Sequence, residues 1–555
     1  MSATPATQQS PPLRAEATTL DEGERDAAKL PPRLPQPRAA AGSGVRDRDL
    51  AAAAPYLADW EAFQRELTAR RPAAAPQAAS EAPESRATPA APAAARAPKA
   101  PETSGTLEIN GLRRAAIERF AVLGFPTTRQ EEWRFTNLAP LARAACRRPL
   151  PLAAAAAASR ISPADLAPWT FDAAARLVFV DGRLAPELSD LGSTPAAGSP
   201  LPPGIVVESL AVALAREPRL LAPYLGRFAS FAEQPFVALN TAFLEDGALV
   251  MMPRGAVLER PIHLLYLSTA GSAGEAAAAP GAAEAAEDVG RAPALVVSYP
   301  RTLIVAGEGS QLTVVETYAG QGAYFSCGVT ELVAGAGAVI DHYKVQRESR
   351  DAYHLATLQV YGERACNISS HSISLGGGLV RNDVNALLDG EGIECILNGL
   401  YLADGRQLVD NHMRVEHAKP HCASHELYKG ILDGRARSVF NGLIHVHPGA
   451  QKTDAKQSNR NLLLSPEAIA NSNPRLEIFA DDVKCTHGST VGQLDDDAIF
   501  YLRSRGIGLE AARSLLTYAF ASDILGRIKV EPVRHDLEEY LFARLPQGEV
   551  VRQAV

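Results

Sequence analysis

The sequence has few cysteines, and no two of them form a Cys-x-x-Cys pair. The six cysteines are scattered along the chain at Cys146, Cys327, Cys366, Cys395, Cys422 and Cys485. Without paired spacing, neither a disulfide framework nor a complete zinc or cluster cage can be inferred from these residues. The scatter is typical of a protein that works in the reducing cytoplasm.

Long apolar runs are also missing. No stretch of about 18 apolar residues is present, so the sequence predicts no transmembrane helix. The N-terminus has no apolar core for a signal peptide, and acidic residues between Glu16 and Asp26 argue against an organellar transit peptide. The formal net charge is -8 and the pI is about 5.9. These values give no reason to expect binding to nucleic acid or to an anionic membrane.

The sequence contains none of the short motifs that mark nucleotide or acyl-transfer sites. The absence of GxxxxGK[ST] predicts that the chain has no ATP site of its own. Neither a GxGxxG fingerprint nor a GxSxG nucleophile elbow is present. The glycines therefore look structural, at turns that need a positive φ.

The composition divides the first part of the chain into three segments. Residues 1–47 are rich in Pro, Ala, Gln and charge, which predicts a disordered tail. Residues 48–72 carry large apolar side chains at helical spacing and predict one amphipathic helix. These side chains are Tyr56, Trp60, Phe63 and Leu67. Residues 73–105 predict a Pro/Ala-rich linker.

The rest of the chain changes character twice. Residues 106–230 predict an N-terminal domain of helices and short strands. Residues 231–493 predict a β-rich core, interrupted by a low-complexity loop at 270–292. Residues 494–546 return to helical spacing and predict a C-terminal helical domain, with Asp495, Asp496 and Asp497 as capping acids at its start.

The turns of the β-rich core are quasi-regular. Glycine-bearing turns fall at Gly307, Gly335, Gly377, Gly390, Gly405, Gly434 and Gly449. Their separations are close to multiples of about 14 or 15 residues, a spacing that favours a β-solenoid of stacked rungs. An antiparallel sandwich remains the alternative, because it also spaces its turns regularly.

One short segment, DDVKCTHGSTVG, carries a thiol and an imidazole at close spacing. Cys485 and His487 are two residues apart, so on a strand they share a face. Together they form half of a tetrahedral site for iron or zinc, and a cluster usually takes about four ligands. Any site here would need completing from another chain. The alternative is a buried cysteine beside a hydrogen-bonded histidine.

Two other histidine-rich segments have weaker patterns. The segment NHMRVEHAKPHCASHELYKG contains His412, His417, His421, Cys422 and His425. Their spacing matches no closed metal site, and histidines on loops or solenoid faces are commoner. His445 and His447 form a second same-face pair, for which surface decoration is the simpler interpretation.

The helix expected at 509–528 is apolar on much of its circumference. Its apolar residues include Leu515, Leu516, Tyr518, Phe520, Ile524 and Leu525. Such a helix must bury against its own body or against another protein. From the pattern alone, its own body is the commoner answer.

Several segments along the chain resemble a known family. QKTDAKQSNRNLLLS and PRLEIFADDVKCTHGSTVG are the most specific segments, and PHCASHELYKGIL and LGFPTTRQEEWRFTNL support them. These segments are similar to the SufD branch of the SufB/SufD family of the SUF iron–sulfur cluster assembly system. The resemblance runs from about Leu50 to Leu545. The N-terminal tail and the inserts at 73–104 and 270–292 are longer than the family leads one to expect.

The resemblance implies a fold and partners. It implies a right-handed parallel β-helix flanked by N- and C-terminal helical domains. It also implies a complex in which the β-helix pairs with SufB and the C-terminal helical domain docks the ATPase SufC, with a homodimer possible where SufB is absent. Under this interpretation the helix with Leu515, Leu516, Phe520 and Ile524 becomes part of the SufC docking surface. The nucleotide site then lies in SufC.

The resemblance also gives Cys485 and His487 a role. They would bind the nascent iron–sulfur cluster, or its iron, transiently at the interface with SufB, which supplies the remaining ligands. His487 is the stronger candidate. SufB itself has the same fold, but the Cys-Thr-His at 485–487 and the absence of clustered N-terminal cysteines favour SufD.

The sequence therefore predicts a non-catalytic scaffold subunit. One alternative is a pure assembly platform that holds SufB and SufC without binding metal. Another is a β-helix enzyme acting on polysaccharide. That enzyme would need paired carboxylates at rung spacing and a secretion signal, and the sequence shows neither.

Overall fold

The computed structural model describes most of the chain beyond residue 51. The described residues are 52–69, 108–144, 146–149, 158, 160–191, 201–269 and 295–555. All of them belong to one compact unit, Val45–Val555. The predicted tail (1–47), linker (73–105) and low-complexity loop (270–292) lie outside the described residues.

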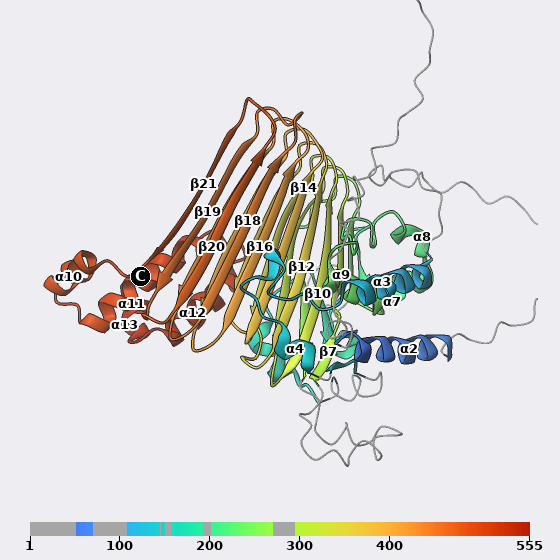
Figure 1. Cartoon of the computed structure of the whole chain (residues 1–555), viewed down its shortest axis with the longest axis horizontal. Coiled ribbons are helices and arrows are strands. Elements are labelled where there is room, and N and C mark those ends of the chain that lie inside the picture. The colour runs from blue at the N-terminus through green and yellow to red at the C-terminus, as the bar shows by residue number, and fades with distance from the viewer. Residues whose placement is uncertain are drawn as a thin grey trace, which may run out of the picture. The chain divides into compact units, whose positions relative to one another are not determined.

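Two large sheets form the centre of this unit (Figure 1). Sheet A runs in the order β20 (Ile469–Ile478), β18 (Arg437–Val446), β16 (Leu408–His417), β14 (Leu379–Leu388), β12 (Tyr353–Gly362), β10 (Tyr324–Ala334), β8 (Arg301–Ala306), β5 (Ala248–Met252), β4 (Val206–Ser209), with β7 (Leu295–Ser298) and β1 (Cys146–Arg147) beside β10. Sheet B runs in the order β21 (Lys484–Gly492), β19 (Asp454–Leu463), β17 (Ala423–Leu432), β15 (Glu394–Ala403), β13 (Asn367–Ser374), β11 (Val339–Arg347), β9 (Gln311–Gly320), β6 (Ile262–Ser268), β2 (Ala175–Val180), β3 (Arg183–Leu184).

From β8 to β21, successive strands alternate between the two sheets, and neighbours within each sheet are parallel from β5 to β20 and from β2 to β21. The chain therefore coils as a parallel β-helix, which confirms the solenoid and shows that the antiparallel sandwich is wrong. From β8 to β21, paired residues on neighbouring rungs are 26 to 32 positions apart in sequence. The spacing of about 14 or 15 residues between glycine turns is thus half a turn, one strand and its bend. The right-handed sense stays a prediction of the resemblance.

Apolar side chains stack in register inside the β-helix. One such column in sheet A runs through five successive strands: Leu332, Val360, Ala386, Val415 and Ile444. All five residues are buried. Burying one large aliphatic side chain contributes roughly 1.5–3 kcal/mol, so repetition of such columns stabilises the stack of rungs.

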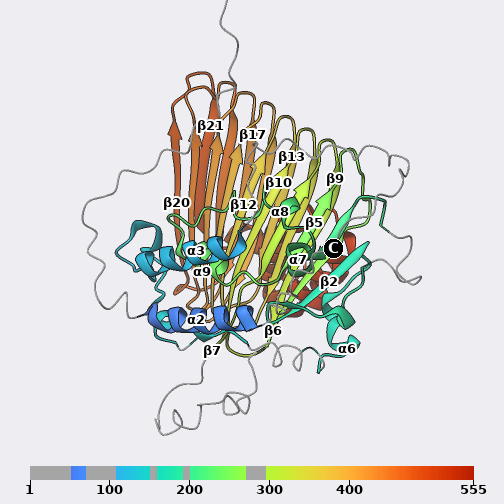
Figure 2. The ribbon, with the colours of Figure 1, turned by 90° about the vertical axis from the view of Figure 1, so that its right-hand side faces the viewer.

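The N-terminal helices cover the outer face of sheet A (Figure 2). They are α2 (Ala54–Ala69), α3 (Ile109–Leu123), η1 (Glu131–Trp133), α4 (Ala139–Arg143), α7 (Leu210–Arg216), α8 (Pro218–Leu221) and α9 (Pro235–Ala242). Three short helices, α6 (Pro163–Leu166), η2 (Ala167–Trp169) and η3 (Pro186–Leu188), pack instead against β2 and β6 of sheet B. An aromatic cluster joins α2, α3 and α9 to the sheet, with Phe236 in contact with Trp133 and with Phe325 of β10. The segment 106–230, predicted as an N-terminal domain of helices and short strands, already contains β2 of sheet B.

The C-terminal helices are α10 (Asp496–Ser504), α11 (Leu509–Leu525), α12 (Glu531–Arg544) and α13 (Gly548–Ala554). Asp495 caps α10, as predicted, by accepting hydrogen bonds from the backbone N–H groups of Asp497 and Ala498. Helices α11 and α12 pack on the outer face of sheet B, where apolar residues of six neighbouring strands from β9 to β19 share a cluster with them. None of the described helices is long and apolar enough to span a bilayer.

Candidate functional site

The β-helix ends on two open edges. Among the described residues, β21 pairs only with β19, and β20 pairs only with β18. Each edge strand therefore presents a row of backbone groups that could pair with another chain. Large apolar side chains are exposed at the same end: Ile469, Ile478, Phe479 and Val491. This end of the solenoid has the character of an uncovered interface.

Cys485 and His487 both lie on the edge strand β21. The alternation of a strand places them on one face, as predicted. Cys485 is half-buried beside Ala455 of β19, and this burial raises the pKa of its thiol. His487 is exposed. The imidazole is thus open to a ligand from outside, whereas the thiol is predominantly protonated at neutral pH.

The open end by itself does not form a closed metal site. Within the described part of the chain, no group of three or more His, Cys, Asp or Glu side chains is arranged to hold a metal ion. Cys485 and His487 supply two donors of the types that iron and zinc accept. The arrangement can therefore act as part of a ligand set that another chain completes.

Two buried polar residues extend inward from His487, and the sequence pattern did not reveal them. Gln457 of β19 is the register partner of His487, and Glu426 of β17 is the register partner of Gln457. Both are buried, and the Gln457 amide donates to the Glu426 carboxylate over 2.9 Å. Burial raises the pKa of Glu426 to about 7. Only knowledge of the rung register could have found this column.

The five residues of the histidine-rich segment do not converge. His417 is buried, shares a 2.8 Å hydrogen bond with Ser424 and has its pKa lowered to about 4 by burial. The thiol of Cys422 donates to the Gly390 carbonyl at 3.1 Å. The side chains of His421 and His425 are 58% and 44% exposed. The segment serves packing and the surface of the solenoid.

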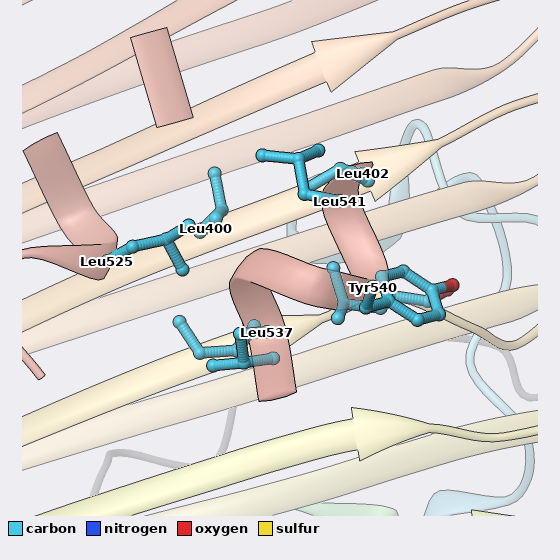
Figure 3. A pocket seen from close by; sticks show the side chains of 8 residues that line it. Leu400, Leu402, Leu525, Leu537, Tyr540 and Leu541 are labelled. Carbon is cyan, nitrogen blue, oxygen red and sulfur yellow. The ribbon is translucent and has the colours of Figure 1, made fainter. Parts of the chain in front are cut away.

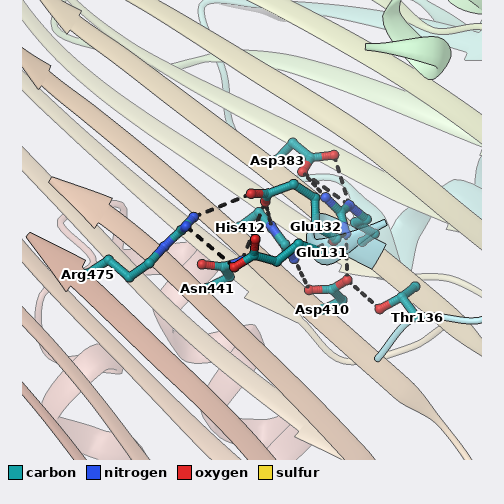
Figure 4. Close-up of polar contacts among 9 residues, drawn as sticks. Glu131, Glu132, Thr136, Asp383, Asp410, His412, Asn441 and Arg475 are labelled. Carbon is teal, nitrogen blue, oxygen red and sulfur yellow. Dashed lines mark hydrogen bonds and ion pairs between the residues drawn. The ribbon is translucent and has the colours of Figure 1, made fainter. Parts of the chain in front are cut away.

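His412, the remaining member, joins the N-terminal segment to sheet A (Figure 4). Its ring nitrogens lie 3.0 Å from Asp410 and 3.2 Å from Glu132 of η1. Burial alone would lower the pKa of His412, but the two carboxylates outweigh it and raise the pKa to about 9. The imidazole is therefore a cation at neutral pH.

Further charged contacts reinforce this attachment. Arg381 stacks on Trp133 with its guanidinium carbon 3.6 Å from the ring centroid, and Arg475 of β20 lies 3.3 Å from Glu132. The QEEWRFTN segment thereby reaches from the aromatic cluster to the last strand of sheet A. Its conspicuous sequence is explained by attachment to the β-helix.

The structure changes the choice of partner-facing residues on the C-terminal helices. Ile524, predicted as a docking residue, is fully buried against sheet B and offers no surface to a partner in this structure. Leu515, Leu516 and Phe520 are half-buried. Helix α10 has no buried residue, and its Phe500 and Tyr501 are 73% and 57% exposed.

Helices α11 and α12 are firmly attached to sheet B. Leu537, Tyr540 and Leu541 of α12 and Leu525 of α11 face Leu400 and Leu402 of β15 around a small apolar cavity (Figure 3). Lys429 of β17 lies 2.9 Å from Asp523, and the Tyr540 hydroxyl donates to the Leu375 carbonyl at 2.9 Å. These contacts join both helices to the sheet whose last strand carries His487.

Comparison with known proteins identifies the family. The SufBD core domain of the SUF system for FeS cluster assembly matches residues 289–520, and the SufBD protein N-terminal region matches residues 188–264. The iron–sulfur cluster assembly protein SufD of Escherichia coli is 32% identical over 429 residues, covering 77% of this chain and 90% of that protein. An iron–sulfur cluster assembly SufBD family protein of Synechocystis is 32% identical over 443 residues, covering 78% of this chain and 90% of that protein. The residues matched by the two family domains include strands of the β-helix and helices on both sides of it. The chain therefore belongs to the SufBD family of iron–sulfur cluster assembly proteins and is a SufD-like member of it.

Proposed function

We propose that this chain is a non-catalytic scaffold subunit of an iron–sulfur cluster assembly complex, acting with SufB and the ATPase SufC. The nascent cluster, or its iron, is the cargo. His487 contributes an imidazole ligand and Cys485 a thiolate, and SufB contributes the remaining ligands. ATP is bound by SufC.

The observation that carries this proposal is the edge strand β21 with its two donors. Among the described residues, no strand pairs with its outer edge and no further ligand joins its two donors, and apolar side chains are exposed nearby. Pairing with a similar solenoid end would cover the apolar side chains and bring further donors to His487. A cluster assembled there would be held between two chains and released when they separate.

The attachment of α11 and α12 to sheet B supports a second part of the proposal. SufC docked on the C-terminal helices would pull on α11 when it binds ATP. The Lys429–Asp523 ion pair and the apolar contacts around Leu400 transmit that movement to sheet B. The movement would reach β21 through the parallel ladder and open the interface that holds the cargo.

Replacing His487 with alanine is expected to abolish iron and sulfide incorporation while the complex with SufB and SufC still forms. The side chain is exposed, so its loss removes a ligand without creating a cavity. The measurement is anaerobic reconstitution of the co-purified complex, with iron and sulfide counted per complex and size-exclusion chromatography as the check on assembly.

The matched control is His425→Ala, which removes an exposed histidine from β17 of the same sheet. It should leave incorporation unchanged. Unchanged incorporation in His487→Ala would instead favour the alternative, a platform without metal ligation. The half-buried, protonated Cys485 is the observation that keeps this alternative open. Failure to associate with either partner would contradict both.

The exposed aromatic pair of α10 gives a test of SufC docking. Replacing Phe500 and Tyr501 together with alanine should weaken binding of SufC at least tenfold, because exposed aromatic side chains are typical anchors of protein interfaces. Calorimetric titration of SufC into the SufB-bound chain measures the effect. Phe135→Ala, which removes another exposed aromatic ring far from α10 in sequence, is the control. Equal affinities for wild type and the double variant would place the docking surface elsewhere.

A further inference from the structure

A second group of potential metal ligands lies on the outer face of sheet A. His445 and His447 flank Val446 at the end of β18. Val446 is fully buried, so the two histidines point to the opposite, outer side. Their ring centroids are 4.7 Å apart. A His-x-His pair on a strand therefore presents two imidazoles side by side to solvent.

Two carboxylates border this histidine pair on the neighbouring strands. The register places Glu416 of β16 and Glu477 of β20 on either side of His445. His445 Nδ1 lies 3.0 Å from a Glu477 oxygen, and His447 Nε2 lies 3.4 Å from a Glu416 oxygen. Three strands of a parallel sheet thus bring two imidazoles and two carboxylates into one patch.

We propose that these four residues form a binding site for a divalent transition-metal ion of the zinc or ferrous iron type. Imidazole and carboxylate are ligands that both ions accept, and four donors match the tetrahedral preference of zinc. The site uses residues of this chain alone. It is separate from Cys485 and His487 and does not depend on the proposed scaffold function.

Binding requires movement of side chains only. In the structure His445 contacts Glu477 and His447 contacts Glu416. Within the described residues, no three of these four side chains converge on one point. Their side chains are 21–48% exposed, so they can turn without disturbing the core. The ladder holds the backbone at this point, because the His447 N–H donates to the His417 carbonyl and the Phe479 N–H donates to the Val446 carbonyl.

One cation competes with the metal. Arg414 donates to Glu416 over 2.7 Å and occupies that carboxylate. A bound metal ion would have to share or displace this contact. Replacing Arg414 with glutamine frees this carboxylate and should therefore raise metal affinity. A purely structural role of Glu416 gives no reason for such a change.

The test is titration of the full chain, carrying no histidine tag, with Co²⁺ and competing Zn²⁺. Cys485→Ser/His487→Ala is the background, so the cargo ligands cannot contribute. We expect one Co²⁺ per chain, with the visible absorption of a four-coordinate ion that Zn²⁺ removes. In that background His445→Ala/His447→Ala should weaken binding at least tenfold.

A matched control removes two other exposed histidines, by His421→Asn/His425→Ala, and should keep the wild-type affinity. Circular dichroism checks that each variant is folded. The proposal is overturned if His445→Ala/His447→Ala binds Co²⁺ as tightly as its background. It is equally overturned if the control loses as much affinity, since binding would then depend on surface histidines in general. Failure of cluster assembly in His487→Ala would affect neither result.

Discussion

Replacing Arg301 with methionine is expected to lower the free energy of unfolding by about 3–5 kcal/mol. Arg301 of β8 forms an ion pair with Glu331 of β10, and both side chains are completely buried. Arg301 also donates to Asn240 of α9 at 3.1 Å. Removing the guanidinium leaves the carboxylate buried without its cation, which costs far more than the ion pair itself contributes.

Glu331 also joins this ion pair to the loop that precedes α9. Its carboxylate also accepts backbone N–H groups of Gly226, Phe228 and Ala229, in the loop before α9. Urea unfolding followed by circular dichroism measures the effect. Arg216→Met removes an arginine that pairs with Glu208 on the surface and should change stability by less than about 1 kcal/mol. An unfolding midpoint for Arg301→Met equal to that of Arg216→Met would contradict the prediction.

Replacing Glu426 with glutamine is expected to stabilise the chain at pH 8 and to have little effect near pH 4. Burial raises the pKa of Glu426 to about 7, whereas an unfolded glutamate titrates near 4.3. A carboxyl with a raised pKa holds its proton more tightly in the folded state. Stability is therefore lost as the pH rises from about 4 to about 7, by roughly 2–5 kcal/mol in total. Glutamine has no such ionisation.

Thermal unfolding of both proteins between pH 4.5 and pH 8 measures this difference. The expected result is a gap in midpoint temperature that widens with pH up to about 7 and is constant above it. Glu394→Gln changes an exposed glutamate at the start of β15 and should show no pH-dependent gap. A gap for Glu426→Gln that is the same at every pH would mean that packing, and not ionisation, separates the two proteins.

The regular spacing of the turns was visible in the sequence, but the way in which the strands pair was not. Glycines at turns such as Gly405 and Gly434 have φ of 62° and 61°, and these two lie 29 residues apart, which is one full turn of the β-helix. Spacing alone is the same for strands that return antiparallel and for strands that alternate between two parallel sheets. The direction of pairing is decided by which strands meet across about 30 residues of chain, and this is a long-range choice.

The candidate site, too, was predicted only in part, because local spacing is visible in the sequence and the pairing of distant strands is not. Cys485 and His487 share a face because they are two residues apart on one strand, which is a local property. Gln457 and Glu426 stand behind His487 only because three rungs are stacked in one register. Ile524 is another residue whose surroundings the sequence did not reveal. An apolar helix face does not indicate whether its own sheet or a partner protein will cover it.

The sequence by itself determined the family, the repeating strands and turns, and the local pair of donors on β21, because motifs and periodicities are properties of neighbouring residues. Tertiary structure alone decided that β20 and β21 are the edge strands of the described sheets, that α11 packs on sheet B, and that His445 and His447 lie beside two glutamates. Each of these depends on register between strands about 30 residues apart. Hydrogen-bonded ladders and stacked cores set that register, and no local pattern in the chain encodes it.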